Sequence, residues 1–185
     1  MNESVRELKI VSVSKCTRDG GVYMAILREL EGERMMPVLM DRSDALQLLM
    51  KMKGRRTNGF PMCIADVMRA VFAQSEMDVV EVRIIAVQAG NTYCHILFRD
   101  HGFYRMIRGC RAADGLILAY TFNSPITIGE SLLAQQYMRE LDGGLYSMPV
   151  NSVNIEALKE ALERAIEEEN YELASQLRDE IERRK

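Results

Sequence analysis

Several features on which enzymes commonly rely are scarce or absent in this sequence. It contains only two histidines among 185 residues. His95 falls within an expected strand and His101 in a turn, and neither has a sequence neighbour suited to nucleophilic or metal chemistry. The glycine pair at 20–21 stands in a hairpin turn rather than before a helix, so it does not form a phosphate-cradling loop. The sequence therefore offers neither a familiar nucleotide-binding loop nor a histidine-based catalytic site.

Cysteines and long apolar runs are also sparse. Cys16, Cys63, Cys94 and Cys110 lie far apart inside apolar segments, without the paired spacing of a zinc site or a disulfide framework. We interpret them as reduced, buried thiols. No apolar run approaches the roughly 20 residues that a membrane-spanning helix needs, and the N-terminus is polar. These absences predict a cytoplasmic protein without membrane association.

Neither sign of charge dominates the chain as a whole. The formal net charge is −3, of which −4 falls in residues 151–185 and +1 in the 150 residues before them. A near-neutral body lacks the general basic character of many nucleic-acid-binding domains, although a local basic groove would still be compatible with such binding. With 48% hydrophobic residues, the chain is sufficient for one domain of moderate size and a tail.

The clearest pattern lies in the tail, residues 155–185. Its interruption at residues 167–170 separates two amphipathic stretches, and Asn170 tolerates the left-handed conformation that ends a helix. We predict two short helices folded into a hairpin with their apolar stripes facing each other; one continuous helix is the alternative. The stripes repeat at intervals of three and four residues, at Ile155, Leu158, Leu162 and Ile166 and then at Tyr171, Ala174, Leu177 and Ile181.

The second half of this tail resembles a known interaction motif. Residues 170–174 (Asn-Tyr-Glu-Leu-Ala) and 177–181 (Leu-Arg-Asp-Glu-Ile) resemble the UVR motif of the excision-repair proteins UvrB and UvrC and of some protease adaptors. In that family a helical hairpin pairs with a similar hairpin or with another partner. A hairpin this small has too little core to be stable alone, so we expect it to dock on the body, to bind a second copy, or to bind a protein partner. The resemblance implies partner-binding roles for Tyr171, Leu177, Arg178 and Asp179.

The body is predicted to be α+β, because strands paired in hairpins alternate with inserted helices. Alternating apolar and polar residues predict strands at 5–16, 22–30, 35–40, 79–87, 93–99, 103–109 and 126–128. Apolar spacing and chain breakers predict helices at 43–53 (with Ser43 as the cap), 62–73, 112–120 and 131–141. We divide the chain into a body (1–141), a linker (142–154) and the hairpin (155–185).

The remaining candidates for chemistry are charged residues at the ends of these elements. Arg111 and Asp114 flank the start of an apolar helix, Asp44 begins another, and Asp66 stands among apolar neighbours in a third. Asp44 and Asp114 have a structural alternative, because an acid in the first turn of a helix is stabilised by the helix dipole, and the alternative for Asp66 is that it faces solvent. If Asp44, Asp66 and Asp114 converge, they are candidate ligands for a divalent cation such as Mg²⁺, as in many phosphodiester-cleaving sites.

Three parts of the body resemble the bifunctional nuclease (BFN) domain family: residues 37–54, the hairpin at 90–98, and residues 110–126. The similarity runs over most of residues 5–135. Members of the family share an α+β fold and act on both RNA and DNA. The resemblance implies a mixed or antiparallel sheet with packed helices, and a nuclease that hydrolyses phosphodiester bonds in RNA, DNA or both.

The same resemblance suggests site residues. The family has an acidic residue where Asp44 stands and a His-Asp pair where this chain has Ala65 and Asp66. Its Arg-x-Ser-Asp-Ala motif appears at 111–115 as Arg-Ala-Ala-Asp-Gly. The resemblance implies that the acids transfer protons or bind metal, and that the arginine holds the scissile phosphate, whose geometry its fork matches. The predicted catalytic residues are Asp44, Asp66, Arg111 and Asp114.

Two departures from the family pattern bear on activity. Ala65 replaces the His and Ala113 replaces the Ser. A missing proton-transfer group typically costs about 10²–10⁴-fold in rate, so we expect weak or absent nuclease activity. The alternative function is a catalytically degenerate BFN-fold adaptor or regulatory scaffold that acts through its hairpin. The basic loop carrying Arg55 and Arg56 is predicted to steer a nucleic-acid strand, and unpaired strands favour a homo-oligomer.

Overall fold

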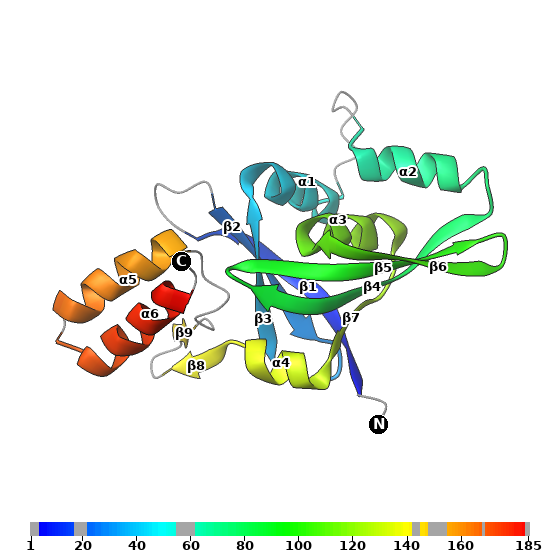
Figure 1. Ribbon diagram of the computed structural model, residues 1–185. Coiled ribbons are helices and arrows are strands. Elements are labelled where there is room, and N and C mark those ends of the chain that lie inside the picture. Colours follow the sequence, from blue (N-terminus) through cyan, green and yellow to red (C-terminus); the bar gives the residue numbers. More distant parts are fainter. Residues whose placement is uncertain are drawn as a thin grey trace.

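A curled, mixed sheet of seven strands forms the centre of the body (Figure 1). The computed structural model describes residues 4–16, 22–54, 62–141, 145–147, 155–167 and 169–183. Neighbouring strands are antiparallel except β7 and β4, which are parallel. In sheet order the strands are β3 (Met35–Asp41), β2 (Val22–Glu29), β1 (Val5–Lys15), β7 (Ile126–Gly129), β4 (Met77–Gln88), β5 (Asn91–Asp100) and β6 (Phe103–Arg111). The predicted α+β class is confirmed.

Helices cover both faces of this sheet. On one face lie α1 (Arg42–Met52), α2 (Ile64–Phe72) and α3 (Ala112–Phe122), and on the other lies α4 (Glu130–Gln136) (Figure 1). Most of α3 is buried, including both its sheet side and its outer side. A helix that is apolar nearly all round needs cover on every side, which explains why α3 packs against the sheet as well as against α1 and α2.

A close approach fixes the depth of α3 against the sheet. A Cβ atom added at Gly115 would lie 2.6 Å from Sγ of Cys94 and 2.9 Å from Cγ1 of Val82. Real Cβ atoms do not come so close to other heavy atoms, so a larger residue at 115 would push the helix outward. Glycine at this position therefore helps to place the first turn of α3 at the end of the sheet.

Three strands lead into helices without an intervening loop, and one of them is β7, which ends at Gly129 directly before α4. Strand β3 ends at Asp41 and α1 begins at the next residue, and β6 ends at Arg111 directly before α3. Asp41, rather than the predicted Ser43, is the N-cap of α1: its Oδ1 accepts hydrogen bonds from the Asp44 backbone N–H (2.9 Å) and from the Ser43 hydroxyl (2.8 Å). The Asp41 carboxylate accepts both hydrogen bonds at once. Ser43 lies inside the first turn, so its hydroxyl donates to the cap and does not itself act as the cap.

The predicted helix at 131–141 is too long. Helix α4 ends at Gln136, and Tyr137 is extended. The backbone N–H of Met138 donates to the carbonyl of Met35 in β3 at 2.6 Å, so a bridge to the sheet draws the chain out of helical geometry. A short strand, β8 (Arg139–Leu141), then pairs with β9 (Leu145–Ser147), which lies inside the predicted linker; the rest of that linker lies outside the described residues.

The tail forms the predicted hairpin from α5 (Ile155–Glu167) and α6 (Tyr171–Arg183). Two positions were predicted wrongly, because Ile166 is 53% and Tyr171 68% exposed. Helix α5 instead continues its inner face from Leu158 to Ala165, a small residue that lets the two helices approach closely. The hairpin has a core of its own, made of Leu158, Ala165, Ala174, Leu177 and Ile181.

The turn of the hairpin also differs from the expectation. Glu169, not Asn170, adopts the left-handed conformation, with φ of +55°. The backbone N–H groups of Glu169 and Asn170 donate to the carbonyls of Ile166 and Ala165 at 3.1 and 2.8 Å, which closes α5. Asn170 begins the next helix, because its side-chain oxygen accepts the N–H of Leu173 at 3.2 Å.

The cysteines are less buried than the sequence predicts. The four thiols are free, and Cys94 is buried as expected, but Cys16, just past the end of β1, is exposed. Within the described ranges, no helix combines the length and the apolar character needed to cross a bilayer.

Candidate functional site

Arg111, at the junction of β6 and α3, is surrounded by carboxylates from two helix starts. Its Nε and Nη2 donate to the two carboxylate oxygens of Asp114, both at 2.9 Å. Its Nη1 donates to Oδ2 of Asp44 at 3.2 Å and lies 3.8 Å from Oδ2 of Asp41. We call Asp41, Asp44, Arg111 and Asp114 the Arg111 cluster. With every member ionised it holds three negative charges and one positive charge.

The local structure explains why these groups meet. Asp44 lies in the first turn of α1 and Asp114 in the first turn of α3. Strands β3 and β6 are the two edge strands of the curled sheet, and the helices that follow them without a loop pack against each other, which brings their starts together. Acids in a first turn are stabilised by the helix dipole. Asp44 and Asp114 are therefore each stabilised at the start of a helix, and both also pair with Arg111.

Asp44 is the buried member of the cluster, with 5% exposure. Burial raises the pKa of its carboxyl, and the neighbouring carboxylate of Asp41 raises it further, against the opposing effect of Arg111. The pKa of Asp41 is lowered instead, first by the hydrogen bond from the Asp44 backbone N–H and then by that from the Ser43 hydroxyl. The pKa values of these two acids, which are three residues apart, are thus shifted in opposite directions, and Asp44 binds its proton more tightly.

The guanidinium of Arg111 remains open to a ligand on its outer side. Its side chain is 59% exposed, and its hydrogen bonds to Asp44 and Asp114 use three of the five N–H groups that an arginine carries. Helix α3 has no side-chain hydrogen bond at its N-cap, so its first backbone N–H groups lack the usual acceptor. An arginine beside an uncapped helix start is an arrangement that suits a phosphate.

Asp66 lies in a different setting, near the other end of α1. Its Oδ1 accepts from Nζ of Lys51 at 2.6 Å, and its Oδ2 accepts from the backbone N–H and the thiol of Cys63 at 3.2 and 3.0 Å. Burial alone would raise the pKa of Asp66, but the hydrogen bonds from Lys51 and Cys63 outweigh it, and the pKa is lowered. Lys51 follows Asp44 by seven residues, which corresponds to about 10 Å along a helix axis.

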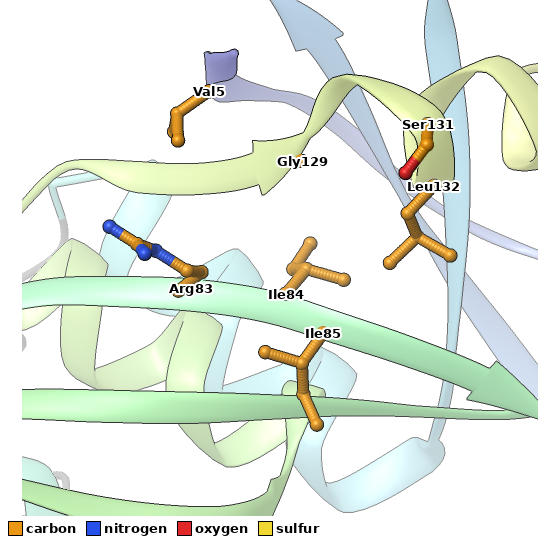
Figure 2. A pocket seen from close by; sticks show the side chains of 7 residues that line it. All are labelled: Val5, Arg83, Ile84, Ile85, Gly129, Ser131 and Leu132. Atoms are coloured by element: carbon orange, nitrogen blue, oxygen red, sulfur yellow. The ribbon is translucent and has the colours of Figure 1, made fainter. Parts of the chain in front are cut away.

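The structure thus brings together three of the four predicted catalytic residues. Asp44, Arg111 and Asp114 come together, whereas no hydrogen bond or ion pair among the described residues joins Asp66 to them. A pocket of about 530 Å³ lies elsewhere, between β4 and the start of α4 (Figure 2). It is lined by Val5, Arg83, Ile84, Ile85, Gly129, Ser131 and Leu132, so none of the predicted catalytic residues lies in its wall.

The acids do not form the cation site that the sequence suggested. In the part of the chain that the structure describes, no group of three or more His, Cys, Asp and Glu side chains is arranged to hold a metal ion. Asp44 and Asp114 both accept hydrogen bonds from Arg111, and Asp66 is engaged by Lys51. The positive charges beside these acids already occupy the places that a cation would take.

The two positions that depart from the BFN pattern are packed into the core. Ala65 is 1% and Ala113 5% exposed, and both belong to the main apolar cluster of the body. A histidine at 65 would have to displace packed side chains, which typically destabilises a core. The loss of the His is therefore accompanied by closure of the space that it would need.

Sequence reasoning missed Asp41, Lys51 and Cys63. Asp41 carried a usable signal, since an acid just before a helix and three residues before another acid is typical of an N-cap. Lys51 and Cys63 carried none, because their role depends on how α1 and α2 pack. Arg55 and Arg56 lie outside the described residues. In the hairpin, Leu177 is buried while Tyr171, Arg178 and Asp179 are exposed.

Comparison with known proteins agrees with this architecture. The model of the bifunctional nuclease domain family matches residues 25–140, and that of the UvrB/uvrC motif matches residues 152–184. Two curated proteins, "Uncharacterized protein MT1877" of Mycobacterium tuberculosis (strain CDC 1551 / Oshkosh) and "Uncharacterized protein Rv1829" of Mycobacterium tuberculosis (strain ATCC 25618 / H37Rv), are each 29% identical over 112 residues. That stretch is 60% of this chain and 63% of each relative, so the match spans somewhat less than two thirds of their length. The chain belongs to the bifunctional nuclease domain family and carries a UvrB/UvrC motif at its C-terminal end.

Proposed function

We propose that this protein binds the phosphodiester backbone of RNA or DNA at the Arg111 cluster and hydrolyses it slowly. The observation that carries the proposal is the position of Arg111, which bridges Asp44 and Asp114 beside the uncapped start of α3. Membership of the bifunctional nuclease domain family supports the substrate class. The hairpin, which matches the UvrB/UvrC motif, would recruit a protein partner or a second copy.

Arg111 is the phosphate-binding group in this proposal. Asp114 holds the guanidinium in plane through two parallel hydrogen bonds of 2.9 Å, so the remaining N–H groups point in fixed directions. A planar fork with fixed donors matches two phosphate oxygens better than a lysine would. Asp114 is thus a positioning residue that acts through Arg111.

Asp44 is the proton-transfer group. Because its pKa is raised by burial and by Asp41, it stays protonated to a higher pH than an ordinary aspartate does. A protonated Asp44 can donate to the leaving oxygen as the phosphorus–oxygen bond breaks, while the oxygen of a water molecule bonds to phosphorus and that water releases a proton to solvent, from which Asp44 is reprotonated. Protonation also removes one negative charge from the Arg111 cluster, which eases the approach of an anionic phosphate.

Slow turnover follows from the two alanines. Ala65 and Ala113 remove the His and the Ser hydroxyl of the family pattern, and both are buried. Asp66 cannot replace the His at the Arg111 cluster while Lys51 and Cys63 hold it. We assign Asp66 a structural role, the joining of α2 to α1.

The test is cleavage of end-labelled single-stranded RNA and DNA by the full chain, with and without Mg²⁺ or Mn²⁺. Arg111→Gln should abolish most of the cleavage, whereas Arg83→Gln should not, because Arg83 pairs with Glu81 on β4. Arg83→Gln is a matched control, since it also removes an exposed arginine from an ion pair. Cleavage that is equally sensitive or equally insensitive to both changes would point to another site or to a contaminating nuclease.

A non-catalytic scaffold is the second candidate, and the burial of Ala65 and Ala113 favours it. Fluorescence anisotropy with the same oligonucleotides separates the two. Binding that depends on Arg111 without any turnover would identify a nucleic-acid-binding scaffold. Absence of both binding and turnover, together with a protein partner that is lost in Tyr171→Ala, would identify an adaptor that acts through the exposed side of the hairpin.

A further inference from the structure

Strand β6 contains an extra residue shortly before it joins α3. Ile107 pairs with Ile96 of β5. Cys110, three residues further along β6, pairs with Cys94, which is only two residues from Ile96. One residue of β6 therefore has no partner on β5, and the strand forms a β-bulge. Gly109 lies in this bulge with a φ of +69°, a left-handed conformation that residues with a Cβ atom rarely adopt.

The bulge decides which residue of β5 lies opposite Arg111. A regular ladder continued from Ile107 and Ile96 would place Arg111 opposite Thr92, whose side chain is only 7% exposed. The extra residue moves the pairing by one position, so that Arg111 lies opposite Tyr93 instead. Successive residues of a strand point to opposite faces of the sheet. The bulge therefore turns Arg111 away from the face on which Thr92 is buried.

His95, on β5 beside the bulge, supplies a hydrogen-bond acceptor for it. The backbone N–H of Gly109 donates to Nδ1 of His95 at 3.3 Å. An N–H group can bond only to a ring nitrogen that has a lone pair, so Nδ1 is unprotonated and the proton of the neutral ring is on Nε2. An imidazolium carries a proton on both nitrogens and accepts no hydrogen bond. The bond to the bulge therefore requires a neutral His95.

The charged groups near His95 do not compensate for its protonation. Arg83 lies directly opposite on β4, and its Nη2 donates to Oε1 of Glu81 at 2.8 Å. On β6, Arg108 directly precedes the bulge glycine, and on β5 the nearest titratable residue is Tyr93. In the part of the chain that the structure describes, no hydrogen bond or ion pair joins His95 to a carboxylate. Protonation would thus place two cations opposite each other, which is unfavourable in a sheet.

We propose that neutral His95 is a positioning residue for the Arg111 cluster, because it holds the β6 bulge that sets the orientation of Arg111. Arg111 follows Gly109 by two residues and is itself the N-cap of α3, so a change in the bulge is transmitted directly to its backbone. The consequence for phosphate binding rests on the proposed function, whereas the link between His95 and Arg111 does not. One neutral hydrogen bond typically changes an equilibrium by about two- to tenfold, and we expect an effect of that size.

The test compares the full chain with His95→Asn and His95→Ala over a range of pH. Oδ1 of an asparagine lies close to the position of Nδ1 and accepts the same N–H, but it does not titrate. His95→Ala has no acceptor at any pH. His101→Asn is the matched control, because His101 is bonded to Asp100 in the β5–β6 turn, away from the bulge. Asparagine also tolerates the left-handed backbone of His101, whose φ is +46°.

Two readouts are measured, and the first needs no nucleic acid. In NMR spectra of the wild type, the Gly109 amide signal and the Arg111 Nε–H signal should both follow the titration of His95 as the pH falls, with an additional shift that His95→Asn lacks. The second readout is fluorescence anisotropy with a labelled single-stranded RNA. The affinity of the wild type relative to His95→Asn should fall by about two- to tenfold over the same pH range, and this ratio cancels the titration of Asp44, which both proteins contain. His95→Ala should bind about two- to tenfold less tightly than His95→Asn at every pH, and His101→Asn should follow the wild type.

Two results would overturn the proposal. A Gly109 amide signal that is insensitive to the titration of His95 would show that the hydrogen bond is not formed in solution. An Arg111 Nε–H signal that is the same in His95→Asn and His95→Ala would show that the bulge does not set the orientation of Arg111. If none of the proteins binds the RNA, the proposed function fails, and the NMR signals still decide the role of His95.

Discussion

Two acids that the BFN resemblance identified lie at the two ends of helix α1, in opposite electrostatic settings. Asp44 belongs to the start of α1, whereas Asp66 belongs to α2 and contacts the last turn of α1. At its start, Asp44 shares one arginine with Asp41 and Asp114. Near its last turn, Lys51 is paired with the single carboxylate of Asp66. Carboxylates outnumber cations at the first site, and the pKa of Asp44 is raised; charges balance at the second, and the pKa of Asp66 is lowered. Correspondence of sequence positions therefore does not fix a chemical role, because the surrounding charges decide it.

Removing the cation from each end of α1 in turn should give the largest difference in cleavage rate. Arg111→Gln takes away the phosphate-binding donors, and loss of such a donor typically costs about 10²–10³-fold in rate. Lys51→Gln should leave the rate of cleavage within a few-fold of the wild type, because Lys51 contacts Asp66 and not the Arg111 cluster. Single-turnover cleavage of a labelled oligonucleotide measures both. A similar loss in the two variants would break the contrast between the two ends.

Removal of the acid at the start of α1 should have the next largest effect. Asp44→Asn abolishes the proton donor, with an expected loss of about 10²-fold or more. It should not lower the thermal unfolding temperature at pH 7, because a carboxyl whose folded pKa is raised above its unfolded value destabilises the fold at every pH above the unfolded value. A strong loss of stability, measured by circular dichroism, would instead assign Asp44 a structural ion pair with Arg111.

Restoring the family histidine should not restore activity. Ala65 is 1% exposed, and overfilling a packed core typically costs about 1–3 kcal/mol. We therefore expect Ala65→His to unfold at a lower temperature than the wild type and to cleave no faster. Faster cleavage by this variant would show that α2 can move to bring position 65 and Asp66 to the Arg111 cluster.

Removal of the acid at the other end should affect stability rather than rate. Asp66→Asn weakens the link to Lys51 and Cys63, for which we expect a loss of about 1–2 kcal/mol in the free energy of unfolding. The pKa of Asp66 is lowered in the folded state, so its contribution is present above the unfolded pKa of about 3.9 and is lost as the pH falls through the folded value. Urea unfolding at pH 7 should separate the variant from the wild type, and the difference should vanish at strongly acidic pH.

Much of the fold was predictable because local patterns decide it. Alternation identified the strands of the β4–β5–β6 meander, and Gly54, with a φ of +62°, closes α1 as expected. The errors lie where long-range contacts override local preference. The bridge from Met138 to Met35 ends α4 early, and Ala165 rather than Ile166 faces the second helix of the hairpin.

The residues of the candidate site were predictable because charged residues at the start of a predicted helix can be recognised in the sequence. Asp44, Arg111 and Asp114 each stand at a junction of a strand and a helix, and the fold brings these junctions together. The pairing of Asp66 with Lys51 was not predictable, because 15 residues and a loop separate them and only the packing of α2 beside α1 brings them into contact. Sequence thus identified the charged groups, and tertiary packing divided them between two sites.

The most direct test of the contrast is a pH titration of the aspartate carboxyl carbons by NMR in the intact chain. Asp44 is expected to titrate above the ordinary aspartate value of about 3.9, and Asp66 below it. Spectra of Asp44→Asn and Asp66→Asn assign the two signals. If Asp44 titrates at or below the pKa of Asp66, the two ends of α1 are electrostatically alike, and the assignment of proton transfer to Asp44 is contradicted.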